Sequence, residues 1–139
     1  MAASESSAPT DPLAVDMPLR VRYVECDRMG VAHHSHYPVW FEMGRTELLR
    51  SLGMTYRQCE DAGIFFVVTY LEIRFRAPAH YDDELLLRTT QRRMTRVRID
   101  HDYRLTREGI VLCEAHSTIG CVDRSGRVSP IPSPLRPAD

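Results

Sequence analysis

The second half of the chain alternates apolar and polar residues with a period of two. The alternation is strictest from residue 97 to residue 105, where Val97, Ile99, His101, Tyr103 and Leu105 alternate with charged residues. A period of two is typical of a β-strand with one buried face. Similar patterns predict strands over 65–77, 84–93 and 110–123, and in the first of these Leu71, Ile73 and Phe75 are expected to face inward. Turn residues such as Glu108-Gly109 join consecutive strands, so we expect an antiparallel sheet.

The first half of the chain begins with a strand pattern and then becomes helical. Leu19, Val21 and Tyr23 alternate with polar residues and predict a strand over 19–25, followed by a loop over 26–36. A helix is expected from Tyr37 to about residue 53, because the proline that follows Tyr37 is tolerated in a first helical turn. A second short helix over 55–62 has Thr55 as its N-cap. Residues 1–17 show no periodicity, and we expect a mobile tail.

The helix that begins at Tyr37 carries apolar residues almost all round its circumference, which is typical of a helix buried on more than one side. We expect an ion pair between Glu42 and Arg45 to fix this helix to the sheet. The order of elements is satisfied by one antiparallel sheet of about five strands wrapped around one long central helix. The expected fold class is therefore α+β. A single domain would cover residues 18–132, followed by a proline-rich tail over 133–139.

The composition excludes several classes of protein. The chain has 139 residues, of which 43% are hydrophobic and 27% charged, as expected for one soluble domain. A formal net charge of -1 argues against a protein that mainly neutralises nucleic-acid phosphates. The apolar runs are too short for a transmembrane helix, and the first residues lack the pattern of a secretory signal. We therefore expect a cytoplasmic protein.

Two residue types narrow the possible chemistry. All 18 basic residues are arginine, which excludes a catalytic lysine and a Walker-type phosphate loop. The four cysteines form no Cys-x-x-Cys pair, so reduced thiols are expected.

The segment between the first strand and the first helix concentrates the chemically active side chains. It reads Tyr23-Val-Glu25-Cys26-Asp27-Arg28-Met29-Gly30-Val31-Ala32-His33-His34-Ser35-His36-Tyr37. An acid, a flexible glycine and three histidines thus precede a helix N-terminus, whose exposed amides stabilise negative charge. Such amides can hold the oxyanion that forms when a carboxylate, or a water that it activates, attacks an acyl carbonyl. The segment therefore predicts acyl-group hydrolysis.

This segment, with the helix after it, resembles a known family. The pattern Tyr-x-Glu-x-Asp-x-x-Gly-Val-x-x-His-x-x-Tyr, followed by Trp-Phe-Glu-x-x-Arg-x-Glu-Leu-Leu-Arg, is similar to the 4-hydroxybenzoyl-CoA thioesterase family of hot-dog folds. Within that family it is most similar to the Tol-Pal-associated acyl-CoA thioesterases. The resemblance covers residues 19 to about 132. It implies a hot-dog subunit, an acyl-CoA substrate, no cofactor, and a homodimer or homotetramer with shared active sites.

The resemblance also implies roles for single residues. The family's catalytic carboxylate falls on Asp27, as general base or nucleophile, and its accompanying tyrosine and histidine fall on Tyr23 and His34. The oxyanion amide would belong to His34 or a close neighbour, with Gly30 and Tyr37 shaping the loop and the helix start. Many members have an aromatic residue where His33 stands, which bears on acyl-chain preference.

Arginine side chains are the candidates to bind the phosphates of coenzyme A, because the guanidinium fork matches phosphate oxygens. Arg93 and Arg96, near the junction of the third and fourth strands, are the two we select. Charged residues on the outer face of a one-sided sheet are also the norm, and this remains the competing interpretation.

Several alternatives stay open at this point. His33, His34 and His36 are zinc-ligand residue types, but adjacent histidines do not easily converge on one ion, so we expect no metal. A hot-dog acyl-CoA hydratase or dehydratase is disfavoured, because its Gly-Pro and Asp-to-His spacings are absent. A non-catalytic acyl-CoA-binding module would share the fold. Coenzyme A and acyl carrier protein are not distinguished as the acyl carrier.

Overall fold

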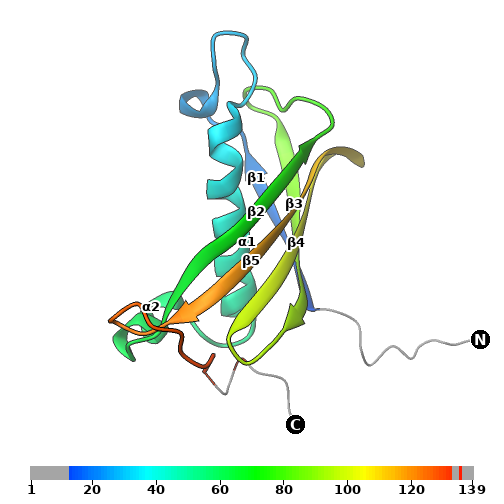
Figure 1. The fold of residues 1–139 in the computed structure, drawn as a ribbon. Helices are drawn as coiled ribbons and strands as arrows, with labels where there is room; N and C mark the ends of the chain where they lie inside the picture. The colour runs from blue at the N-terminus through cyan, green and yellow to red at the C-terminus, as the bar shows by residue number, and fades with distance from the viewer. Residues whose placement is uncertain (1–12, 133–134, 136–139) are drawn as a thin grey trace, which may run out of the picture.

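The computed structural model describes residues 13–132 and Leu135, and it forms one curved sheet around one helix (Figure 1). The strands are β1 (Leu13–Arg20), β2 (Phe65–Phe75), β3 (Glu84–Met94), β4 (Arg98–Arg107) and β5 (Ile110–Val122). The α-helices are α1 (Tyr37–Ser51) and α2 (Tyr56–Asp61), and two 3₁₀ turns cover Tyr23–Glu25 and His34–His36. All strand pairs are antiparallel, in the order β1-β3-β4-β5-β2. The predicted α+β hot-dog fold is confirmed.

Strand β1 corrects the predicted N-terminal boundary. It begins at Leu13 and pairs with β3, so residues 13–17 belong to the sheet rather than to a tail. The period-two pattern extends back through Leu19, Met17 and Val15, which are partly buried. Pro18 obscures this pattern, but an edge strand tolerates proline because one row of its amides needs no partner. The predicted strand over 19–25 ends early, at Arg20, and residues 1–12 of the expected tail lie outside the described residues.

Helix α1 packs on the sheet through one face only. Trp40, Phe41 and Leu48 are buried against the sheet, whereas Val39 and Met43 are exposed in the protomer. The prediction of a helix buried on more than one side is therefore wrong for the single chain. Gly44 allows the close approach, because a Cβ there would lie 2.1 Å from Thr89 Oγ1.

A buried polar network corrects the predicted ion pair in α1. Glu42 is exposed, whereas the buried Arg45 donates a hydrogen bond to Tyr103 Oη (2.8 Å), which in turn lies 2.5 Å from Ser117 Oγ. The hydroxyls of Tyr103 and Ser117 take the place of the expected Glu42 carboxylate. Arg45 therefore links α1 to β4 and β5 through neutral partners.

The inward pattern of the sheet is confirmed for β4, where Ile99, His101, Tyr103 and Leu105 are buried. It is wrong for Phe75, which is 52% exposed in the protomer and meets the Tyr37 ring at an interplanar angle of 88°. Phe75 is the last residue of the edge strand β2, where no further strand covers it.

The C-terminal end of the described chain completes a second apolar cluster. Ile131 and Leu135 pack with Leu49, Cys59 and Cys121. Leu135 belongs to the expected proline-rich tail over 133–139 and packs onto this cluster, and the rest of that tail lies outside the described residues. Thr55 caps α2 as predicted, with its side chain accepting a hydrogen bond from the Gln58 amide.

Candidate functional site

The loop before α1 is folded into a tight turn. An isolated bridge pairs Cys26 with Ala32, and the Asp27 amide donates to the Val31 carbonyl (2.9 Å). The Gly30 amide donates to the Asp27 carbonyl (3.0 Å), and Gly30 has a φ of 77°. This left-handed backbone conformation is the reason for glycine at the turn.

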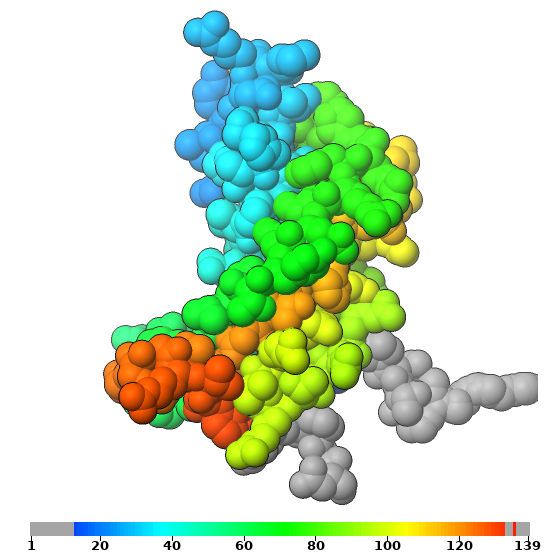
Figure 2. All heavy atoms as spheres, viewed as in Figure 1, coloured from blue at the N-terminus to red at the C-terminus, as the bar shows by residue number. Residues whose placement is uncertain are grey.

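The segment after β2 holds this turn from the other side. The Ala32 amide donates to the Ala79 carbonyl (2.7 Å), and the Tyr81 amide donates to the Gly30 carbonyl (3.1 Å). The ring of Tyr81 also meets the Tyr23 ring edge-on, with centroids 5.5 Å apart. Figure 2 shows the loop and this segment side by side at one end of the molecule. The backbone of the loop is therefore well supported, although many of its side chains are exposed.

A buried carboxylate, Glu25, anchors the loop. Its Oε1 accepts a hydrogen bond from the Arg22 amide (2.7 Å), and its Oε2 accepts one from Trp40 Nε1 (2.9 Å). Burial acts to raise the pKa of Glu25, but these hydrogen bonds and the Arg22 charge outweigh burial and lower it. Sequence reasoning assigned Glu25 no role. A glutamate three residues after Arg22, at the end of a predicted strand, gives no signal that it is buried.

The start of α1 offers a backbone donor. The His33 ring accepts a hydrogen bond from the Ser35 amide (3.2 Å) and so caps the 3₁₀ turn that leads into the helix. Among the described residues, the His34 amide has no acceptor. Tyr37 follows at the helix start, is buried against Trp40 and Phe75, and has its pKa raised by burial.

A hollow of about 320 Å³ lies beside this helix start. It is lined by Ala32, His34, Tyr37, Phe75, Arg76, Ala77 and Pro78. The structure thus brings His34 and Tyr37 together with the last residues of β2. The volume falls within the usual range for small-molecule sites.

Asp27 and Tyr23 lie on the same loop but do not line this hollow in the protomer. Tyr23 is 79% exposed. Asp27 is also exposed, and its Oδ1 accepts hydrogen bonds from the Met29 amide (2.8 Å) and the Val31 amide (3.4 Å). Amides of its own loop, and not those of the helix start, therefore donate the described hydrogen bonds to this carboxylate.

The two selected arginines lie far from the loop within one protomer. The start of β3 is next to the loop, since the Val21 amide donates to the Asp83 carbonyl. Arg93 follows nine residues into β3, roughly 30 Å along an extended strand. Arg96 lies in the turn between β3 and β4, at the opposite end of the sheet (Figure 1).

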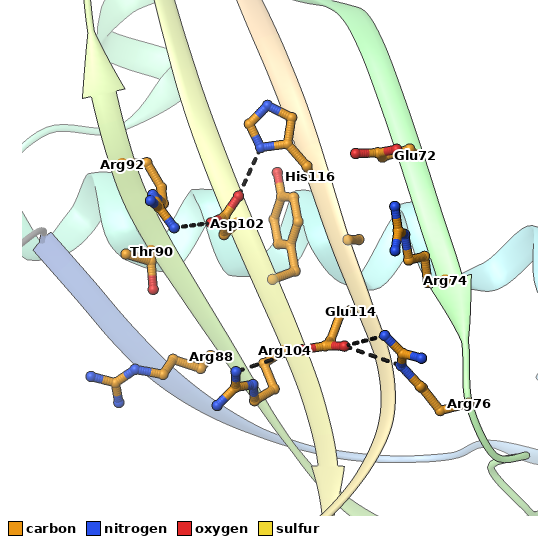
Figure 3. A pocket seen from close by; sticks show the side chains of 12 residues that line it. Glu72, Arg74, Arg76, Arg88, Thr90, Arg92, Asp102, Arg104, Glu114 and His116 are labelled. Atoms are coloured by element: carbon orange, nitrogen blue, oxygen red, sulfur yellow. Dashed lines mark hydrogen bonds and ion pairs between the residues drawn. The ribbon is translucent and has the colours of Figure 1, made fainter.

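A second hollow, of about 460 Å³, lies on the outer face of the sheet (Figure 3). Its charged side chains largely pair with one another. Arg92 and His116 both contact Asp102, and Arg76 and Arg104 both contact Glu114. Figure 3 shows these pairs bridging neighbouring strands. The outer hollow therefore resembles a solvated, ion-paired surface.

The structure also bears on the metal alternative and on the reactivity of Cys26. In the described part of the chain, no three His, Cys, Asp or Glu side chains are grouped so that they could hold a metal ion. Cys26 Sγ points to the Arg22 carbonyl (3.6 Å), and burial, with the Glu25 and Asp27 charges, raises the pKa of this thiol. A protonated thiol is a poor nucleophile. No helix in the described residues has the length and apolar character needed to cross a membrane.

Comparisons with known proteins agree with this architecture. The sequence profile of the Thioesterase-like superfamily matches residues 21–138. An acyl-CoA thioesterase from Haemophilus influenzae, YbgC, is 35% identical over 118 residues, covering 84% of this chain and 86% of that protein.

Solved structures of thioesterases superpose on this fold. A probable thioesterase from Bartonella henselae superposes with a TM-score of 0.82 at 29% identity, covering 86% of this chain and 99% of that one. A mutant of 4-hydroxybenzoyl CoA thioesterase, complexed with 4-hydroxybenzoyl CoA, has a TM-score of 0.80. It covers 87% of this chain and 94% of that one at 18% identity, and so shows the shared fold alone. From its profile match, its relatives and its five-stranded sheet around α1, the chain belongs to the thioesterase-like superfamily of hot-dog proteins.

Proposed function

We propose that this protein is an acyl-CoA thioesterase that hydrolyses the thioester bond of its substrate. The single observation that carries the proposal is the unpaired His34 amide at the start of α1, beside a hollow of about 320 Å³. An N–H group with no protein acceptor is available to the oxygen of a bound thioester. The similarity to YbgC of Haemophilus influenzae supports coenzyme A as the carrier.

The proposed chemistry uses the Asp27 carboxylate and the His34 backbone amide, which has no acceptor among the described residues. As general base, Asp27 takes a proton from water, whose oxygen attacks the thioester carbon while the His34 amide holds the developing oxyanion. The C–S bond then breaks, and the thiol leaves with a proton. As nucleophile, Asp27 would form an anhydride that water hydrolyses in a second step. Tyr23 and the His34 side chain are proposed to position Asp27 or the water.

A second copy of the chain is proposed to complete the site. The edge strand β2 exposes Val67, Val68 and Tyr70, and the outer face of α1 exposes Val39 and Met43. Pairing two copies along β2 would cover these residues and the open strand edge. We propose a homodimer of this kind, or a homotetramer built from two dimers, with Asp27 and Tyr23 enclosed at the interface.

Dimerisation would also bring the two selected arginines close to a bound coenzyme. A two-fold axis through β2 pairs the two strands antiparallel, so the far end of one sheet approaches the loop of the other. In this arrangement Arg93 and Arg96 of one copy would face the phosphates of a coenzyme A bound at the other copy's site.

The test is release of free thiol from a panel of acyl-CoA thioesters by the wild-type protein and by Asp27→Asn. We expect the variant to lose roughly 10³-fold in kcat, because the amide can neither accept the proton nor attack, while it still binds the coenzyme. Parallel assays with acyl carrier protein thioesters identify the carrier. Binding of acyl-CoA by the wild-type protein without release of thiol would instead show a binding module, and addition of water to an enoyl-CoA would show a hydratase.

A further inference from the structure

Glu25 is 2% exposed and lies two residues before Asp27. Three donors converge on its carboxylate. The Arg22 amide binds Oε1 (2.7 Å), whereas Trp40 Nε1 (2.9 Å) and Arg22 Nη2 (3.2 Å) bind Oε2. An ionised carboxylate accepts on both oxygens and donates on neither, so it satisfies all three.

The backbone of Glu25 holds the other end of the loop. Its carbonyl oxygen accepts a hydrogen bond from the His33 amide (2.8 Å), the residue before the unpaired His34 amide. Glu25 therefore contacts the residues before the loop, the residues after it and, through Trp40, the first turn of α1. Asp27 lies inside the loop that these contacts close.

We infer that Glu25 is a positioning residue that, through its hydrogen bond to Trp40, fixes Asp27 relative to the start of α1. The inference rests on the proposed role of Asp27. Asp27 is exposed, and within the described residues its side chain accepts hydrogen bonds from amides of its own loop, so its distance from the His34 amide depends on how that loop is attached to the helix. A displacement of about 1 Å between reacting groups can cost 10²-fold in rate.

The chain offers a substitution that breaks this attachment without changing volume. In Glu25→Gln the side-chain amide must direct its NH₂ group at one of the two sets of donors, so one set loses its acceptor. In Trp40→Phe the indole N–H is lost, while an aromatic ring stays in the core. Glu72→Gln is the matched control, because it removes the same charge from an exposed side chain of β2.

The experiment measures kcat and KM for an acyl-CoA, together with amide hydrogen exchange, in the wild-type protein, both single variants and the double variant. We expect kcat to fall about tenfold in Glu25→Gln and about threefold in Trp40→Phe, with KM within about twofold. The loss of kcat in the double variant should be smaller than the product of the two single losses, because both substitutions weaken the same attachment of the loop to α1. Amides of residues 26–32 should exchange about tenfold faster, with β4 and β5 unchanged.

Trp40 is the only tryptophan of the chain, so its fluorescence reports on this bond directly. Its emission should shift in Glu25→Gln and stay as in the wild-type protein in Glu72→Gln. Unchanged exchange in residues 26–32, or independent and multiplying losses of kcat, would overturn the inference. If the wild-type protein released no thiol, the proposed function would fail, and the exchange data would still decide whether Glu25 orders the loop.

Discussion

The hollow on the outer face of the sheet and the hollow beside the start of α1 differ more in chemistry than in size. The outer hollow is larger, but its Asp102 and Glu114 carboxylates are already paired with arginines across the strands. The hollow at the start of α1 is smaller and is lined mainly by apolar residues, and the His34 amide has no acceptor among the described residues. A substrate must compete with the existing partner of an ion-paired group. The comparison shows why a bare donor indicates a reaction site better than a large charged cavity does.

The largest effect should come from removing that donor. His33 has a ψ of 142°, the conformation that a residue before proline prefers, so proline fits at position 34. His34→Pro removes the amide proton and the side chain, whereas His34→Ala removes the side chain alone. We expect kcat for acyl-CoA hydrolysis to be about 10²-fold lower in His34→Pro than in His34→Ala. Equal kcat values in two folded variants would remove the His34 amide from the mechanism.

A smaller effect concerns acid stability, which depends on the inner face. His101 is buried beneath α1, and burial, reinforced by the Arg45 charge, lowers its pKa from 6.5 to about 3. Between these two pH values the unfolded chain binds a proton that the folded protein does not, so stability falls as the pH falls. This histidine should contribute a loss of about 1.4 kcal/mol per pH unit below 6.5.

The measurement is the free energy of unfolding in urea at pH 6.5, 5.5 and 4.5. In His101→Gln the free energy of unfolding should fall less steeply with falling pH than in the wild-type protein, by about 1.4 kcal/mol per pH unit. Identical slopes for the two proteins would mean that His101 accepts a proton in the folded state.

The smallest effect is expected on the outer face. Glu114 contacts Arg76 and Arg104, but all three side chains are more than one third exposed. Solvent screens such pairs, so Glu114→Gln should change the free energy of unfolding by less than about 1 kcal/mol and leave kcat unchanged. A large loss of kcat in this variant would show that the outer hollow takes part in the reaction.

The sequence predicted the secondary structure better than it predicted the buried polar contacts. The alternation in β4 and the capping of α2 by Thr55 are local patterns, and both are confirmed. The expected ion pair between Glu42 and Arg45 is wrong, because Arg45 finds its partner on β4, 58 residues further along the chain. The burial of Glu25 was not predicted for the same reason, since the indole that donates to it belongs to Trp40, 15 residues further along the chain.

By itself, the sequence determined the antiparallel sheet around a central helix and the position of the loop before α1, because periodicity and turn residues act over a few neighbouring positions. Only the tertiary structure decided that β1 begins at Leu13, that Glu25 is buried, and that the His34 amide is unpaired while Asp27 lies outside the adjoining hollow. Burial and hydrogen-bond pairing depend on residues that meet only after folding, and a one-dimensional pattern does not specify which of them meet.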